Sequence, residues 1–378
     1  MDSKPVALVA IICCLVVAYT YVGYPLLVVF LARLWPLPPR KNTAYLPYVS
    51  VCVPIYNAAA YLPVKVASLQ ALDYPPDRLE FLLYSDGSTD DTRAVAEALA
   101  EQDPRVRVIA SERRRGKPTA LNVMAERARG EVLMLTDVRQ PLVPGALRAL
   151  VAPLCDPAVG CVSGNLVLEG GTGAGAYWRY ENAIRKAEGR FRGMVGVTGP
   201  LYALRRTDLL PLPEDIILDD MLVPLRLQLA YRLRVVFAPE AVAHDQAFDD
   251  EREFGRKART LAGNYQLLAR LPGLLLPFHY GLWFEFISHK LLRLLCPWLL
   301  VAMLVASLAG VLAPETAPGW RSALTAVLMV GQVVFYALAF VGARAGKIGR
   351  LARTFIVMNA AAVVGLWRFV RGTQRVTW

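Results

Sequence analysis

The amino-acid sequence predicts an α/β protein in which a mostly parallel sheet, with helices on both faces, is flanked by transmembrane helices. Strand-like and helix-like runs alternate between residues 48 and 270, and alternation of this kind is typical of parallel sheets. Long apolar runs stand before and after that region. The first is long enough to cross a bilayer, for which about 20 residues suffice.

Composition favours a membrane protein. The chain has 378 residues, is 55% hydrophobic and carries a formal net charge of +11. An apolar and basic chain fits a protein whose basic residues lie near anionic lipid or a phosphorylated substrate. The six cysteines have no zinc-ligand spacing and the three histidines are scattered. Three of the cysteines fall in runs typical of a membrane helix or a core strand, so we expect no disulfide framework and a cytosolic globular part.

The N-terminal run predicts one transmembrane helix in residues 1–36. Val6 to Leu34 is almost wholly apolar, and Pro25 is expected to kink it. The run is longer than a signal-peptide core and lacks a clear cleavage site. Basic residues follow it, so the positive-inside rule places the N-terminus outside and the next domain in the cytosol. Residues 37–47 form a proline-bearing linker.

The cytosolic domain is predicted to span residues 48–270. Buried strands are expected at Val49–Ile55, Leu79–Tyr84, Val106–Ala110 and Val132–Leu135. Helices are expected at Tyr61–Ala71, Thr92–Glu101 and Thr119–Arg127. The glycine-rich stretch Gly170–Gly175 is expected to be a mobile loop.

The C-terminal part returns to the membrane. Residues 271–290 mix aromatic and apolar side chains, as interfacial segments do. Two transmembrane helices are predicted within residues 291–343, at Leu291–Leu312 and Ala323–Val341. Residues 344–378 form a basic segment whose apolar run, Phe355–Phe369, is an interfacial, re-entrant or fourth transmembrane helix.

A polar turn follows the second predicted strand. Asp86 and Gly87 stand where that strand gives way to a helix. In open α/β sheets, ligands bind at the carboxyl ends of the strands, so Asp86 is a candidate ligand-binding residue. The same residues also suit an ordinary turn.

Five short elements occur in a fixed order along the domain. They are Pro54–Asn57, Asp86, Arg115–Lys117, Asp137–Arg139, and Asp219–Asp220 with the later Arg256–Arg259. This order resembles glycosyltransferase family 2, in its membrane-bound branch similar to cellulose and hyaluronan synthases. The resemblance covers Val49 to Gln266.

The resemblance implies a GT-A fold with a nucleotide-sugar donor, expected to be a UDP-sugar, across the carboxyl ends of the strands. Asp86 would bind the base ring, and Lys117 the base or a phosphate. Lys117 as a solvated charge remains the alternative. The donor-binding residues carried over are Pro54, Tyr56, Asp86, Lys117, Asp137 and Arg259.

The metal-binding motif departs from the family pattern. The family has Asp-x-Asp, whereas Asp137 here is followed by Val138 and Arg139. A divalent metal, Mg or Mn, would bind Asp137 with help from elsewhere, His244 being one candidate. Alternatively, Arg139 partly replaces the metal's charge. A solvated loop position is the other interpretation of His244.

Asp220 is predicted to be the general base that deprotonates the acceptor hydroxyl, in one displacement that inverts the anomeric carbon. Helix capping is its alternative. The residues expected on the acceptor side are Gly199, Tyr202, Asp219 and Arg256. The family's usual Gln and Trp are absent around Arg256–Arg259, which weakens any case for elongation of a long chain.

We therefore expect an inverting glycosyltransferase, integral to a membrane such as the bacterial inner membrane, with its catalytic domain in the cytosol. The acceptor would be a lipid-linked sugar or a polysaccharide. Three or four helices make a poor channel for a polymer. This favours either transfer to a membrane-embedded acceptor or assembly of the chain into a homo-oligomer or with partner subunits. No nucleic-acid partner is expected. A nucleotidyltransferase and a non-catalytic membrane scaffold with a degenerate transferase domain are the rival hypotheses.

Overall fold

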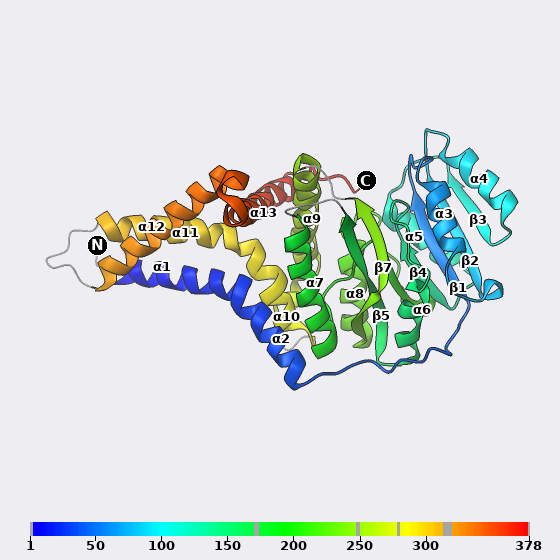
Figure 1. The fold of residues 1–378 in the computed structure, drawn as a ribbon, viewed down its shortest axis with the longest axis horizontal. Helices are drawn as coiled ribbons and strands as arrows, with labels where there is room; N and C mark the ends of the chain where they lie inside the picture. Colours follow the sequence, from blue (N-terminus) through cyan, green and yellow to red (C-terminus); the bar gives the residue numbers. More distant parts are fainter. Residues whose placement is uncertain (1–2, 170–173, 247–249, 278–279, 313–319, 377–378) are drawn as a thin grey trace.

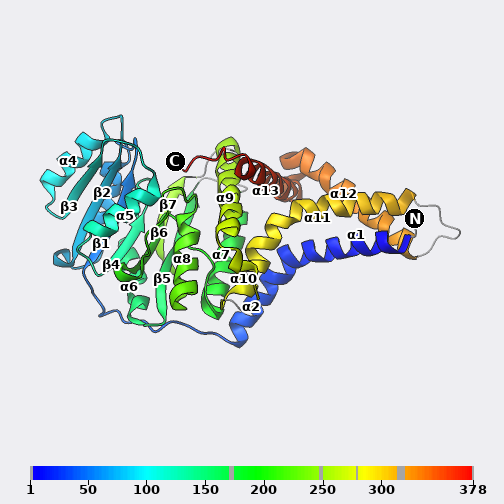
Figure 2. The same cartoon turned by 180° about the vertical axis from the view of Figure 1, so that it is seen from behind.

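The protein is elongated, with the sheet at one end and the apolar helices at the other (Figure 1). The computed structural model describes residues 3–169, 174–246, 250–277, 280–312 and 320–376. Helices α7 (Ala174–Phe191) and α9 (Asp250–Arg270) stand between the two ends in both views (Figures 1 and 2). Most of the stretch predicted as a mobile glycine-rich loop, residues 170–173, lies outside the described residues, and α7 begins directly after it.

A seven-stranded sheet has the order β3-β2-β1-β4-β6-β5-β7. Strand β6 runs antiparallel to both neighbours, while the other pairs are parallel. This confirms the predicted fold class. The strands are β1 (Val49–Ile55), β2 (Leu79–Asp86), β3 (Val106–Ser111), β4 (Val132–Thr136), β5 (Val159–Glu169), β6 (Leu201–Arg205) and β7 (Arg234–Gln246).

Helices cover both faces of the sheet, and alternate strand residues form two separate cores. On β2, Phe81 and Leu83 face one core, whereas Leu82 and Tyr84 face the other. This period of two explains why the strand is a continuous apolar run. The covering helices include α3 (Leu62–Gln70), α4 (Thr92–Gln102), α5 (Lys117–Arg127), α6 (Ala146–Val151) and α8 (Asp219–Tyr231).

Among the described residues, three helical stretches are long and apolar enough to cross a membrane: Pro5–Leu34, Trp283–Leu312 and Ser322–Val370. The first comprises α1 (Ser3–Ala18), a π-helical turn (Tyr19–Gly23) and α2 (Tyr24–Leu34). The chain changes direction at that turn (Figure 1), directly before Pro25. The others comprise α10 (Trp283–Phe286), a second π-helical turn (Ile287–Leu291), α11 (Leu292–Leu312), α12 (Trp320–Val341) and α13 (Gly346–Val370).

Helix α13 turns back toward the sheet end and packs along α9 (Figure 2). Gly365 allows the close approach, because a Cβ there would lie 2.9 Å from the backbone nitrogen of Ala262. The basic apolar run at the C-terminus therefore lies against a helix of the α/β region. Whether it also enters a bilayer stays a prediction.

Candidate functional site

The predicted donor residues gather at one edge because β1, β2 and β4 are parallel. Ile55 pairs with Ser85 across β1 and β2, so Pro54 and Tyr56 lie beside the turn that follows β2. The guanidinium of Arg114 lies 3.7 Å from the centre of the Tyr56 ring. This places an aromatic surface and a cation together at the carboxyl edge of the sheet.

Asp86 is fully buried and fixes the loop that carries the basic run. Its Oδ1 accepts from the Arg115 backbone N–H and its Oδ2 from that of Gly116, both at 2.7 Å. Gly87 has a φ of 64°, and a Cβ there would lie 2.5 Å from the Arg114 backbone nitrogen. Only glycine fits this contact without strain. In this structure Asp86 therefore orders the basic loop, whatever else it binds.

Lys117 joins two carboxylates that are distant in sequence. Its ammonium lies 2.9 Å from Asp137 Oδ1 and 3.5 Å from Asp219 Oδ2. Although burial opposes it, these two carboxylates hold the pKa of Lys117 above its ordinary value. Lys117 is therefore a cation held between the metal-motif aspartate and the start of α8, and a solvated charge is excluded for it in this structure.

A buried lysine that the sequence did not single out supports the Asp137 turn. Lys65 on α3 is fully buried and donates to Thr136 Oγ1 at 2.8 Å and to the Gln140 carbonyl at 2.6 Å. Burial lowers the pKa of Lys65 to about 7, against the opposing effect of Asp137. Its two hydrogen bonds hold both ends of the turn that carries Asp137.

The residue that replaces the second family aspartate is directed toward β7. Arg139 Nη2 lies 2.6 Å from Asp245 Oδ2, which also accepts from Gln140 Nε2 at 2.7 Å. His244 lies 2.9 Å from Glu169 Oε1. In the described part of the chain, no group of three or more His, Cys, Asp or Glu side chains could hold a metal ion.

Asp220 lines a small pocket at the start of α8. A cavity of about 70 Å³ is lined by Asp220, Gly196, Val197, Arg185 and Lys290 among others. Burial and the neighbouring Asp219 carboxylate raise the pKa of Asp220 to about 6. A Cβ on Gly199 would lie 3.0 Å from Asp220 Oδ2, so the glycine leaves room for the carboxylate.

Three other predicted residues lie away from this pocket's lining. Tyr202 is fully buried in the sheet core, and its hydroxyl has no hydrogen-bond partner among the described residues. Arg256 pairs with Glu253 on its own helix at 2.9 Å. Arg259 donates to the Val376 carbonyl at 3.0 Å. The structure thus brings Lys117, Asp137, Asp219 and Asp220 together, and directs the arginine pair to α9 and the C-terminal segment.

A large cavity, hereafter the membrane-side cavity, lies between α7, α9 and the apolar helices. Its volume is about 880 Å³. Much of its lining is apolar and includes Val17, Leu300, Phe335 and Phe355. Five residues line both this cavity and the Asp220 pocket: Arg185, Thr260, Asn264, His289 and Lys290.

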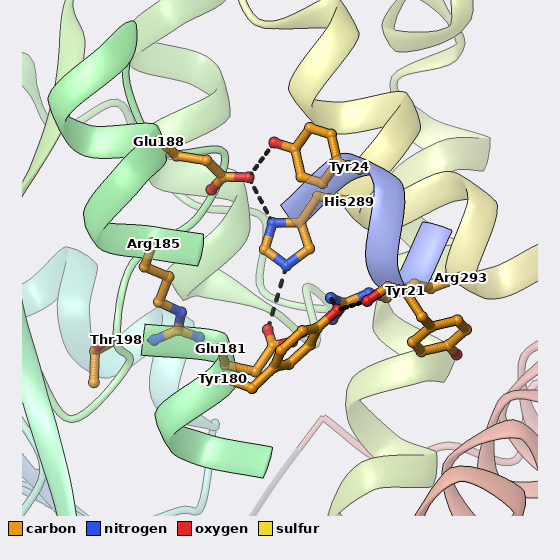
Figure 3. A network of polar contacts seen from close by, with 9 residues as sticks. All are labelled: Tyr21, Tyr24, Tyr180, Glu181, Arg185, Glu188, Thr198, His289 and Arg293. Atoms are coloured by element: carbon orange, nitrogen blue, oxygen red, sulfur yellow. Dashed lines mark hydrogen bonds and ion pairs between the residues drawn. The ribbon is translucent and has the colours of Figure 1, made fainter. Parts of the chain in front are cut away.

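A polar network joins α7 to the apolar helices (Figure 3), and its members Glu181, His289 and Arg293 line the membrane-side cavity. His289 Nδ1 lies 2.7 Å from Glu188 Oε1, and its Nε2 lies 3.3 Å from Glu181 Oε2. Tyr24 donates to Glu188 at 2.6 Å, and Arg293 pairs with Glu181. Tyr24 directly follows the first π-helical turn, and His289 lies in the second. Turns of this kind are frequent at functional sites.

The sequence offered a partial signal for this network. Glutamate, histidine and lysine inside or beside apolar helices are costly and mark functional sites. The pairing of α7 with residues more than 100 positions later is not visible in any local spacing.

Residues 50–207 carry a domain that matches the family described as glycosyl transferase family 2. A solved structure of the mannosyltransferase PcManGT from Pyrobaculum calidifontis, in complex with GDP-Man and Mn²⁺, is 26% identical with a TM-score of 0.75. The similarity covers 96% of this chain and 99% of that one, and it establishes a GT-A-like fold.

Curated relatives match over shorter stretches. A beta-monoglucosyldiacylglycerol synthase from Synechocystis is 27% identical over 50% of this chain and 42% of its own length. An N-acetylglucosaminyltransferase from Mesorhizobium japonicum is 30% identical over 52% of this chain and 51% of its own length. The chain thus spans about half of these relatives. Together with the family match, they support a family 2 glycosyltransferase, while the cellulose and hyaluronan synthase branch stays a prediction.

Proposed function

We propose that this protein is an inverting glycosyltransferase that moves a sugar from a nucleotide-sugar to a lipid-linked acceptor. One observation carries the proposal. The membrane-side cavity and the Asp220 pocket share five lining residues, so the two adjoin and an acceptor held among the apolar helices would lie next to the pocket of the candidate base. A polysaccharide chain has no need of such an apolar wall.

The donor would lie along the carboxyl ends of β1, β2 and β4. Tyr56 and Arg114 offer a stacked aromatic and a guanidinium for the base, and Lys117 offers a cation for phosphate. Asp86 orders the loop and retains lone pairs for a base-ring donor. A UDP-sugar is the donor we propose. The similar structure from Pyrobaculum contains GDP-Man, so a donor screen should include UDP-sugars and GDP-mannose.

A divalent metal fits Asp137 as one protein ligand. Lys117 binds Oδ1, and no described residue donates to Oδ2. Mg²⁺ is commonly bound by one or two carboxylates, with substrate phosphates and water completing the shell. The metal would neutralise charge on the leaving diphosphate, as Mn²⁺ in the similar structure suggests. Lys117 and Arg139 are cations at the same edge.

Asp220 would perform the proton transfer. The acceptor hydroxyl oxygen forms a bond to the anomeric carbon, the bond from that carbon to the diphosphate breaks, and the hydroxyl proton passes to Asp220. The nucleoside diphosphate leaves with the electron pair. A pKa raised to about 6 leaves Asp220 ionised at pH 7 and makes it a better base than an ordinary aspartate.

The setting we propose is the cytosolic face of a bacterial inner membrane. Three helical stretches long enough to cross a membrane support membrane association. Basic residues after the first and around Arg344–Arg353 support a cytosolic catalytic domain.

A donor screen on the purified, lipid-reconstituted protein tests the function against its rivals. Each UDP-sugar and GDP-mannose is supplied with and without membrane lipid extract. A transferase releases nucleoside diphosphate in a lipid-dependent manner. In a parallel reaction with UTP or GTP and a sugar 1-phosphate, release of pyrophosphate would identify a nucleotidyltransferase. No consumption of any donor would favour a non-catalytic scaffold.

A further inference from the structure

We infer that a cationic pocket beside the end of α2 binds an anionic phospholipid whose headgroup carries both a phosphodiester and a hydroxyl, as phosphatidylglycerol does. This lipid would be a bound component of the membrane surface and not a substrate. The inference uses the membrane setting proposed above and is independent of the transfer chemistry. It follows from the charge of the pocket, from a buried polar atom and from an apolar surface that leads to the pocket.

The pocket, hereafter the arginine pocket, has a volume of about 260 Å³. Leu37 lines it three residues after the first candidate membrane stretch ends, and Leu282 lines it directly before the second one begins. The lining also includes residues at or next to the ends of α7 and α8 and at the start of β7: Arg192, Gln228, Arg232, Leu233 and Arg234. None of its described lining residues lines the Asp220 pocket or the membrane-side cavity, so it is a separate site.

Two of the three arginines are tied into the fold. Arg192 donates to the Gly281 carbonyl. Arg234 donates to the Leu37 carbonyl at 2.5 Å and to the Arg192 carbonyl at 3.1 Å. These hydrogen bonds hold both guanidiniums in place at the wall of the pocket. Cations that are already positioned bind an anion at lower entropic cost than cations on mobile chains.

The third arginine supplies charge that no carboxylate neutralises. Glu285 lies 3.6 Å from Arg192, and the Asp156 carboxylate opposes the burial that lowers the pKa of Arg234. The side chain of Arg232 is exposed and forms no hydrogen bond or ion pair with any described residue. Three guanidiniums therefore face two carboxylates. A phosphodiester, with its single negative charge, matches this difference.

The backbone of Arg232 is also unusual. It ends α8 in the left-handed conformation, with a φ of 54°. Glycine is the usual residue at such a position, because it adopts positive φ without strain. An arginine placed there accepts a backbone cost, and a ligand for its guanidinium would offset that cost.

Gln228 narrows the choice of headgroup. Its side chain is buried and its Nε2 donates to the Met194 carbonyl at 2.8 Å, while its Oε1 has no hydrogen-bond partner among the described residues. A buried acceptor without a partner is costly. A hydroxyl donor on a headgroup in the arginine pocket would satisfy it. The pocket therefore suits a phosphate and a hydroxyl on one ligand.

The exposed face of α2 provides a surface for acyl chains. Leu26, Phe30 and Leu34 recur at intervals of four residues and are each more than half exposed, whereas the other face of the helix packs against α7 (Figure 1). Trp35 and Leu37 continue this apolar surface and are also more than half exposed. Because Leu37 lines the arginine pocket, the surface reaches the three guanidiniums. A lipid satisfies both regions, and a soluble phosphate satisfies only one.

Native mass spectrometry of the full chain in detergent micelles tests the inference without donor or acceptor. The probes are phosphatidylglycerol, phosphatidylpropanol, diacylglycerol with the same acyl chains, and glycerol 3-phosphate. We expect phosphatidylglycerol to bind at least about tenfold tighter than diacylglycerol, because hydrogen bonds to charged groups are worth that factor. It should bind about threefold tighter than phosphatidylpropanol, which keeps the charge but has no hydroxyl.

Three binding results would overturn the inference. Equal binding of diacylglycerol would remove the role of the phosphate. Equal binding of phosphatidylpropanol would remove the proposed contact with Gln228. Full displacement of phosphatidylglycerol by millimolar glycerol 3-phosphate would identify a site for a soluble phosphate and not for a lipid.

Variants of Arg232 locate the site, because this side chain has no structural partner among the described residues. Arg232→Gly removes the charge and suits the left-handed backbone. Its melting temperature should stay at or above the wild-type value, while its affinity for phosphatidylglycerol falls about three- to fivefold. Arg232→Lys should recover part of the loss, since it restores the charge but not the planar fork.

Arg344→Gln is the matched control. Arg344 is an exposed arginine directly after α12, on the proposed cytosolic side and outside the lining of the arginine pocket. Its removal should leave the affinity for phosphatidylglycerol at the wild-type value. An equal loss in Arg344→Gln, or wild-type affinity in Arg232→Gly, would indicate diffuse attraction to a basic surface and would refute a specific pocket.

Discussion

The substitution Gly199→Ala probes the position of Asp220 with a single methyl group. The added Cβ would lie 3.0 Å from Asp220 Oδ2 and 3.5 Å from its Cβ and Cγ, so the carboxylate must shift by a few tenths of an ångström. A catalytic group tolerates a displacement of about 0.5 Å from its productive position, and a displacement of about 1 Å can lower the rate about a hundredfold. We therefore expect turnover to fall by roughly three- to tenfold, which is about 1 kcal/mol of transition-state stabilisation.

The assay is nucleoside diphosphate release at saturating donor and acceptor, measured across pH. The methyl group also removes water from the carboxylate, so the acidic limb of the turnover profile, expected near pH 6 from the raised pKa of Asp220, should move upward. Gly145→Ala is the matched control, because a Cβ there meets nothing within 4 Å. Wild-type turnover and an unshifted limb in Gly199→Ala would refute the tight placement of the base.

Three further results are expected. Asp137→Ala should abolish turnover, and excess chelator should stop the wild-type enzyme; full activity in chelator would show that Lys117 or Arg139 supplies the charge. Burial lowers the pKa of Lys65 from 10.5 to about 7. Between pH 7 and pH 10.5, Lys65 is therefore protonated in the unfolded chain but neutral in the folded protein. The melting temperature of the wild-type protein should therefore rise with pH in that window relative to that of Lys65→Met. Parallel curves of melting temperature against pH for the two proteins would contradict the buried charge. Topology reporters should read cytosolic at Arg350 and external within residues 313–319, and a cytosolic reading at the latter would exclude the three-crossing arrangement.

The elements that the sequence predicted well are those buried on both faces. Val49–Ile55 has the predicted bounds, and the strand predicted from Leu79 extends two residues further to Asp86. Continuous apolar runs bounded by turn residues suffice for such strands. Strands β5, β6 and β7 were not placed, because the antiparallel insertion of β6 depends on pairing with β4 and β5, and no local pattern encodes that pairing.

The same distinction holds for the candidate site: residues that follow an apolar run could be predicted from the sequence, whereas residues brought together only by packing could not. Asp137 and Asp220 stand out because each follows an apolar run at an expected place. Lys65 does not, because a lysine on a helix has no sequence signature of burial under Thr136. Arg185 and Lys290 come from elements more than 100 residues apart, and the cavity that joins them exists only after α7 packs against the apolar helices.

The pair Asp220→Asn and Asp86→Asn tests the central claim, that Asp220 is the general base of a sugar transfer, most directly. Asparagine keeps the shape of the side chain, so Asp220→Asn should keep nucleotide affinity near the wild-type value and lose about a hundredfold or more in turnover. Asp86→Asn should weaken nucleotide binding, because the Gly116 N–H or the Arg115 N–H loses a charged acceptor. Near wild-type turnover in Asp220→Asn would contradict the account and leave Asp220 as a helix-capping residue.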